Sequence, residues 1–220
     1  MTRIRMRRVL LSVIIAGGLL GGLYAFASRK GYDSKGFIPG AVAQQRRGKL
    51  ITREKPRAND PVVIRDVKLR GRPAQLNEEF DGTDDWLKDV SFRIQNTSHK
   101  NITYLVVEAS FPDSQATGNL MAHDIRFGRR PDAMNQTREP LLLRPGESLD
   151  IDLGPRYANI KGFLETRQPV SAMKTLSLRP YVVFFEDGTQ WSAGSYFRPD
   201  PSTRGRFIKI PDPPNASAPR

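Results

Sequence analysis

The sequence contains no cysteine, which excludes disulfide bonds, thiolate nucleophiles, cysteine-ligated zinc and a lipidated N-terminal cysteine. It has only two histidines, His99 and His123, which lie in separate turn or strand regions and are expected to be solvated surface groups. The sequence lacks the Gly-x-Ser-x-Gly, P-loop, dinucleotide-binding and His-Glu-x-x-His motifs. These absences indicate a protein that is not an enzyme and needs no cofactor or catalytic metal.

Acidic residues are absent from residues 1–27, which carry four arginines. Residues 28–60 carry nine basic and three acidic side chains, and the other 22 basic and 20 acidic residues fall in 61–220. The net charge of +12 therefore comes in contributions of +4, +6 and +2 from these three segments. A nucleic-acid-binding protein would carry its positive charge on the fold itself, so the sequence predicts no nucleic-acid partner.

Long apolar runs are also scarce, since only residues 9–27 form one without any charge. Nineteen helical residues rise about 28 Å, which is close to the hydrocarbon thickness of a bilayer. Four arginines precede this run, and positive charge favours the cytoplasmic side. We therefore expect a single-pass membrane anchor with a cytoplasmic N-terminus and an extracytoplasmic C-terminal domain.

A cleavable signal peptide is the alternative to a retained anchor. Ala25-Phe26-Ala27 has the small-x-small pattern that precedes a cleavage site, and cleavage there would leave a secreted or periplasmic protein. Against cleavage, Arg29 and Lys30 follow almost at once, where exported mature chains are usually poor in basic residues. After this segment we expect a basic flexible linker over 28–60, one folded domain over 61–210, and a disordered Pro-rich tail over 211–220.

The folded domain shows the period of two that is typical of half-buried strands. Val90, Phe92 and Ile94 alternate with polar residues, and a second apolar run covers 104–111. Turn-forming side chains fill the stretch 96–101 between them, which predicts that the two strands form the central hairpin.

Further strands are expected on both sides of this pair. Pro180 predicts a bulge or an edge in the most apolar strand, and Asp187-Gly188 is a hairpin signal. A helix over 156–167 would cover an open end of the fold. The expected strands are 62–70 with an irregularity at 65–66, 121–128, 149–153 after the turn 144–147, 175–185, 189–191 with 196–197, and an edge strand over 206–210.

Short strands, turn signals and one short helix predict an all-β fold, an antiparallel β-sandwich. Residues 90–153 contain a strand, then Asn96-x-Ser98, then an apolar strand ending in Phe111-Pro112-Asp113, and then Leu143-Arg144-Pro145-Gly146-Glu147. This segment resembles the Ig-like FxLYD-type domains of bacterial envelope proteins, although the literal F-x-L-Y-D string is absent. The resemblance implies an Ig-like fold and an exported, non-catalytic accessory domain.

Aromatic side chains near the last hairpin are the candidate partner surface. Trp191, Tyr196 and Tyr181 could form a platform for an envelope protein, although aromatic side chains also dominate sandwich cores. The acidic loop 78–85 could hold calcium, but its spacing does not match the twelve-residue calcium loop and a solvated turn is the simpler interpretation. Asn-x-Ser/Thr triplets, which would be glycan acceptors only in a glycosylating secretory pathway, begin at Asn96, Asn101, Asn135 and Asn215.

Two functional hypotheses follow from the sequence. The first is a membrane-anchored envelope domain of non-catalytic role that binds another envelope protein through a sheet edge or an aromatic loop. The second is a secreted carbohydrate-active or hydrolytic domain that uses acidic residues such as Asp84 and Asp85 near Trp86 and Trp191.

Overall fold

The computed structural model describes residues 47–57, 59–131 and 138–212, all within one compact unit that spans 42–220. The predicted anchor at 9–27 and most of the Pro-rich tail lie outside the described residues. Among the described residues no helix is long and apolar enough to cross a membrane.

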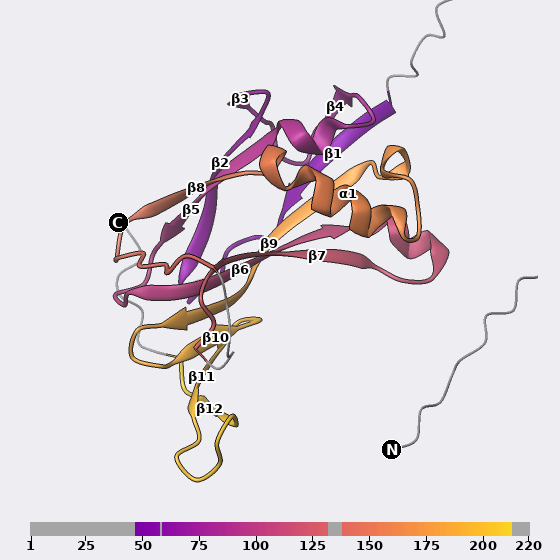
Figure 1. Ribbon diagram of the computed structural model, residues 1–220. Coiled ribbons are helices and arrows are strands. Elements are labelled where there is room, and N and C mark those ends of the chain that lie inside the picture. The colour runs from indigo at the N-terminus through magenta and orange to yellow at the C-terminus, as the bar shows by residue number, and fades with distance from the viewer. Residues whose placement is uncertain (1–46, 58, 132–137, 213–220) are drawn as a thin grey trace, which may run out of the picture. The chain divides into compact units, whose positions relative to one another are not determined.

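The chain folds into two β-sheets that pack face to face (Figure 1). The larger sheet has eight strands and the smaller sheet has four, in the order β3-β2-β5-β8. The larger sheet contains β1 (Arg47–Arg53), β4 (Glu79–Gly82), β6 (Ile102–Phe111), β7 (Met121–Gly128), β9 (Thr175–Phe185), β10 (Gln190–Ser192), β11 (Ser195–Pro199) and β12 (Phe207–Ile210). The smaller sheet contains β2 (Val62–Leu69), β3 (Arg72–Pro73), β5 (Val90–Asn96) and β8 (Ser148–Asp152).

Helical segments are short and connect the strands. The one α-helix is α1 (Tyr157–Glu165), and four 3-10 turns complete the described structure. These turns are η1 (Trp86–Asp89), η2 (Pro112–Thr117), η3 (Gly154–Arg156) and η4 (Val170–Ala172). The prediction of a mostly β, two-sheet fold with one short helix is therefore confirmed.

One hydrophobic core joins the two sheets. Phe92 and Ile94 point into it from β5, and Leu105 and Val107 point into it from β6. All four are at most 2% exposed, as the alternation in the sequence predicts. Burial of the apolar side chains of this core supplies the main stabilising free energy of the fold.

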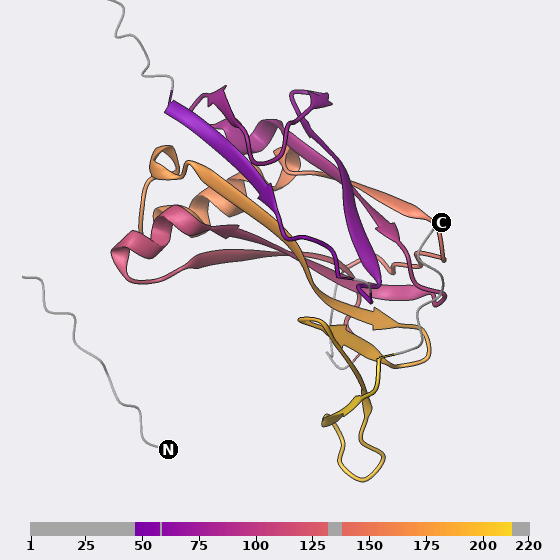
Figure 2. The same ribbon diagram turned by 180° about the vertical axis from the view of Figure 1, so that it is seen from behind.

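Strand β9 is the centre of the larger sheet. It pairs antiparallel with β6 along one edge, while its other edge pairs first with β1, in parallel, and then with β10. Figure 2 shows β1 and β9 running side by side. Pro180 lies where the partner changes from β1 to β10, and the β6–β9 register shifts at the same place. Proline has no N–H to donate, so it fits at this irregularity, and the predicted bulge is confirmed.

The predicted hairpin between β5 and β6 is wrong, because the two strands lie in different sheets. The turn between them crosses from one sheet to the other. Asn96, fully buried, directs the crossing by donating from Nδ2 to the carbonyl oxygens of Lys100 (2.8 Å) and Leu143 (2.9 Å). Its Oδ1 accepts hydrogen bonds from the backbone N–H and the hydroxyl of Ser98. These bonds bend the chain where a hairpin would have continued the ladder.

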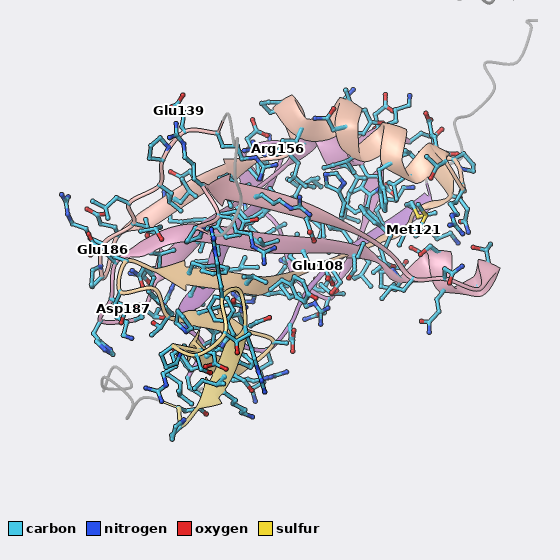
Figure 3. The ribbon with its side chains drawn as sticks, turned by 60° about the horizontal axis from the view of Figure 1, so that its bottom comes forward. Glu108, Met121, Glu139, Arg156, Glu186 and Asp187 are labelled. Carbon is cyan, nitrogen blue, oxygen red and sulfur yellow. The ribbon has the colours of Figure 1, made fainter. Side chains whose placement is uncertain are left out.

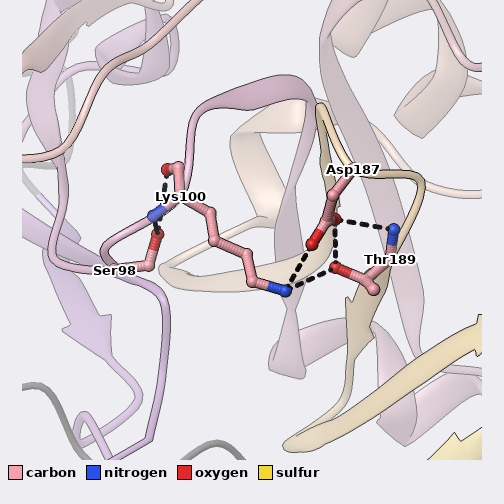
Figure 4. A network of polar contacts seen from close by, with 4 residues as sticks. All are labelled: Ser98, Lys100, Asp187 and Thr189. Carbon is pink, nitrogen blue, oxygen red and sulfur yellow. Dashed lines mark hydrogen bonds and ion pairs between the residues drawn. The ribbon is translucent and has the colours of Figure 1, made fainter.

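The crossover is tied to the β9–β10 turn by a polar network (Figure 4). Lys100 Nζ lies 2.6 Å from Asp187 Oδ2 and 3.1 Å from Thr189 Oγ1. Asp187 in turn accepts hydrogen bonds from the backbone and hydroxyl of Thr189, which closes the predicted Asp187-Gly188 hairpin. The network therefore fixes one corner of the sandwich.

Residues 47–53 form strand β1, which corrects the prediction of a flexible linker over 28–60. Lys49 and Ile51 point inward and are both fully buried. Lys49 Nζ donates to the carbonyl oxygens of Met173 (2.9 Å) and Ser171 (3.3 Å) and lies 6.0 Å from the ring centroid of Trp86. Lysine is normally a surface residue, so a lysine at an inward position interrupts the apolar–polar alternation by which a strand is predicted from the sequence.

Helix α1 lies beside β7 and closes one side of the sandwich (Figure 3). Ile160 and Leu164 of α1 are fully buried in the core. Tyr157–Glu165 is shorter at both ends than the predicted helix 156–167. The helix packs against the core as the predicted lid would.

The other predicted strands are present with small changes at their ends. Strand β2 has its irregularity between Arg65 and Lys68, where Asp66 adopts a positive φ of 48°. The stretch around Leu143 forms only an isolated bridge with Ile102, and β8 follows after the turn. Strand β12 lies at an end of the larger sheet, as predicted for an edge strand.

Candidate protein-binding site

The three predicted partner residues lie close to the loop that precedes β2. Trp191 and Tyr196 face each other across β10 and β11 and are only 3% and 4% exposed. Burial raises the pKa of Tyr196 to about 12, and its hydroxyl donates to the carbonyl oxygen of Asn59. This burial favours core packing for Trp191 and Tyr196. Tyr181 is half-buried, and its place in a partner surface stays a prediction.

The acidic loop 78–85 is built into the fold. Its first half forms β4, which pairs with β1, and Asp85 accepts a hydrogen bond from the hydroxyl of Tyr157 on α1. This bond holds the pKa of Asp85 below its usual range, so the residue is suited to stay ionised and not to act as a general acid. Trp86 is fully buried and donates from Nε1 to the carbonyl oxygen of Met173. In the described part of the chain no three His, Cys, Asp or Glu side chains gather as metal ligands do.

The two histidines differ in burial, and His99 is exposed, as expected for a solvated surface residue. His123, on β7, is partly buried, and its ring lies 5.4 Å from that of Phe163 on α1. Burial lowers the pKa of His123, which favours its neutral form. His123 is therefore only partly solvated, and the expectation of a solvated surface residue holds for it only in part.

Strand β7 has an open edge, which is the feature that sequence reasoning missed. It pairs with β6 over eight residues, from Tyr104 opposite Gly128 to Phe111 opposite Met121. Its other edge pairs with no strand in the described ranges. The other strands at the ends of the two sheets, β3, β4, β8 and β12, have two to five residues, so β7 is the longest terminal strand there. An open edge leaves the N–H and C=O groups of alternate residues available to another chain.

A groove of about 650 Å³ follows this edge. Five consecutive residues of β7, 122–126, line it, and they include side chains from both faces of the strand. The groove therefore runs along the backbone of β7, with α1 on its other side. Asn159 and Phe163 contribute from α1, and Arg156 from the turn before it.

Positive charge dominates the groove. Arg126, Arg138 and Arg156 line it, whereas Asp124 is its one acidic lining residue. Asp124 forms an ion pair with Arg126, with 2.7 Å between the carboxylate and the guanidinium. Arg156 lies 4.9 Å from the ring centroid of Phe127, and this contact holds the cation in the lining of the groove, beside the start of α1 (Figure 3).

The sequence could have supplied part of this site. The strand 121–128 was predicted with its bounds, and Asp124 and Arg126 are two residues apart and so share one face of it. Arg138 and Arg156 lie outside this strand in the sequence. Only the packing of α1 against β7 brings Arg156 to the groove. Comparison with protein-family models, with curated proteins and with solved structures finds no match to this chain.

Proposed function

We propose that this protein is a single-pass, membrane-anchored envelope protein whose extracytoplasmic domain is not catalytic and binds another envelope protein. The open edge of β7, with the groove beside it, is the observation that carries this proposal. The anchor rests on the uncharged run 9–27 and the four arginines before it.

We further propose that the sandwich is Ig-like, of the FxLYD type. The pairing order supports this, because β2-β5-β8 match strands A, B and E of an Ig sheet. In the facing sheet, β7-β6-β9-β10 match strands C′, C, F and G, including the F–G hairpin. The crossover at Asn96 then corresponds to the B–C connection between the sheets. Strand β1, parallel to β9, is an addition to this order.

An extended segment of the partner would add to the larger sheet as a strand next to β7. Main-chain hydrogen bonds supply affinity in this kind of recognition, and side-chain contacts supply specificity. Three arginines line the groove and one of them is paired with Asp124, so the added segment should carry acidic side chains.

Hydrogen exchange tests the added strand directly. Amides of β7 that point to the open edge should exchange quickly in the free protein and slowly in the presence of an eight-residue peptide with alternating Glu and Val. A peptide with Lys in place of Glu is the control and should protect these amides far less. Equal protection by both peptides, or by neither, would contradict the proposed site.

Charge reversal tests the arginines. Arg156→Glu or Arg138→Glu should weaken binding of the acidic peptide by roughly tenfold, since about 1.4 kcal/mol changes an affinity by that factor. Arg72→Glu makes the same charge change on exposed β3 of the other sheet and should leave the affinity unchanged.

The cellular partner is sought by photo-crosslinking. A photoreactive residue at Ala122 or Arg126 should capture one envelope protein of defined mass, whereas the same residue at Arg72 should not. The captured protein, once purified, should protect β7 in the exchange experiment as the acidic peptide does.

Cell fractionation tests the placement in the envelope. Recovery of the intact chain from the soluble cytoplasmic fraction would overturn that placement. N-terminal sequencing of the exported protein distinguishes a retained anchor from a cleaved signal peptide.

A further inference from the structure

Two buried polar atoms have no hydrogen-bond partner in the part of the chain that the structure describes. They are Nε1 of Trp191 and Oδ1 of Asp60. One is a donor and the other an acceptor, and each destabilises the folded protein if it stays unpaired. Native proteins rarely keep such atoms without a reason. Trp86, the other tryptophan of the sequence, donates its Nε1 to Met173 and so has no such deficit.

Both residues line the same pocket, which is separate from the β7 groove. It lies where the edge of β9 passes from β1 to β10, so that Pro180 and its two neighbours face no strand there. The start of β2 closes it from the other side, together with Glu54, Pro56, Arg57 and Asp60. Asp60 is held in place because its Oδ2 accepts a hydrogen bond from the backbone N–H of Arg57 (2.8 Å), which leaves Oδ1 for another donor.

The cations around this pocket already have partners. Arg57 forms an ion pair with Glu54 at 3.0 Å, Arg179 forms one with Glu108 at 2.8 Å, and Arg53 donates to the carbonyl oxygen of Ile64. With Glu54 and Asp60 in the lining as well, an anion would meet two carboxylates. The pocket is therefore better suited to a neutral group.

The ligand must accept a hydrogen bond from Trp191 and donate one to Asp60. The pocket has a volume of about 40 Å³, whereas one water molecule needs roughly 10–15 Å³ by the same measure. A group of about three non-hydrogen atoms fits this space. The carbon, oxygen and nitrogen of a primary carboxamide match the number of atoms and supply both the acceptor and the donor. The apolar side chains of Val62, Ile64 and Pro180 complete the lining around such a group.

We propose that this pocket binds a primary carboxamide, with the carbonyl oxygen on Trp191 Nε1 and the NH₂ group on Asp60 Oδ1. The carboxamide could belong to a small free amide or to an Asn or Gln side chain of a bound protein. The same recognition chemistry serves both sources.

The NMR signals of the two tryptophan indole N–H groups test the proposed carboxamide binding. The full-length protein gives two indole N–H signals by NMR, and acetamide is the probe. Acetamide should shift the Trp191 signal in a saturable way and leave the Trp86 signal in place. Acetate, which has no N–H to donate, should not shift the Trp191 signal. Absence of any shift with acetamide would overturn the proposal, and magnetisation transfer from water to the Trp191 indole would then assign the pocket to ordered water.

Variants test the role of Asp60. Asp60→Ala should weaken acetamide binding at least tenfold, while Asp150→Ala, at an exposed position on β8, should not change it. If Asp60→Ala disturbs the loop, Asp60→Asn keeps an oxygen acceptor and should bind acetamide more weakly than wild type but more tightly than Asp60→Ala. Equal affinity in all three proteins would contradict the assignment.

Peptides distinguish the two sources. If a protein supplies the carboxamide, a short peptide with a central Asn or Gln should shift the Trp191 signal at lower concentration than acetamide, and its Asp or Glu counterpart should not. If a free amide is the ligand, acetamide should bind more tightly than either peptide. These titrations read only the Trp191 pocket, so their outcome is independent of strand addition at β7.

Discussion

Asn96 shows how one buried side chain can decide the path of the chain. Its amide joins the carbonyl oxygens of Lys100 and Leu143, and its oxygen holds Ser98. Asn96→Ala would remove all of these hydrogen bonds, although the Leu143 carbonyl keeps the N–H of Ile102 and the Lys100 carbonyl keeps the hydroxyl of Ser98. We expect a loss of about 3 kcal/mol in the free energy of unfolding, because the substitution removes four hydrogen bonds that contribute about 0.5–1.5 kcal/mol each. Urea denaturation of the two proteins measures the difference.

Asn101 is the matched control at the same turn. It is only half-buried, and its amide donates to the carboxylate of Glu186 at the surface. Asn101→Ala should therefore cost no more than about 1 kcal/mol. Similar losses in the two variants would mean that Asn96 does not direct the crossover.

Individual strands could be predicted from the sequence, but several of their pairings could not. The alternation in Val90–Asn96 and the apolar run in Ile102–Phe111 identify two strands, and a polar turn between them looks the same in a hairpin and in a crossover between sheets. The burial of Asn96 distinguishes the crossover from a hairpin, and this burial depends on Leu143, which is 47 residues away. The β7 groove was missed for a similar reason, since it depends on which strand edges stay open. Strand β1 was missed because its inward Lys49 is bonded to carbonyl groups more than 120 residues away.

Helix α1 is joined to Asp85, the residue before η1, by a pH-sensitive hydrogen bond from the hydroxyl of Tyr157. The bond lowers the pKa of Asp85 in the folded state, so its stabilising contribution is present above the unfolded pKa of about 3.9. The contribution is lost as the pH falls through the lower, folded-state pKa. The Asp85 side chain is 47% exposed, so solvent screening limits the effect to about 1 kcal/mol or less.

Tyr157→Phe should remove this contribution. At pH 7 the variant should unfold at slightly lower urea concentration than wild type, and the gap should narrow as the pH falls below about 3.9, where unfolded aspartate becomes protonated. Urea titrations at a series of pH values measure this. A gap that stays constant down to pH 2 would show that the Tyr157 hydroxyl acts independently of the charge on Asp85.

The two sheets share one core, so damage to either inner face should unfold the whole domain. Phe92→Asp or Val107→Asp places a carboxylate in that core, and we expect a loss above about 4 kcal/mol. Gln95→Asp, on the outward face of β5, should change the stability by only about 0.5 kcal/mol. Circular dichroism and urea denaturation measure these effects, and a folded Phe92→Asp protein that had merely lost binding would contradict the shared core.

The position of β1 changes where the folded domain begins. A chain shortened to start at Val42 keeps β1, whereas one that starts at Pro61, the boundary predicted from the sequence, loses it. Without β1, the first half of β9 has no partner on one edge, β4 has no partner at all, and the core loses Ile51. An unpaired edge beside exposed core residues promotes aggregation. We therefore expect the chain from Val42 to unfold cooperatively in urea and the chain from Pro61 to aggregate or to lack a cooperative transition. Identical transitions for both would show that β1 contributes nothing to the fold and that the domain begins after the linker.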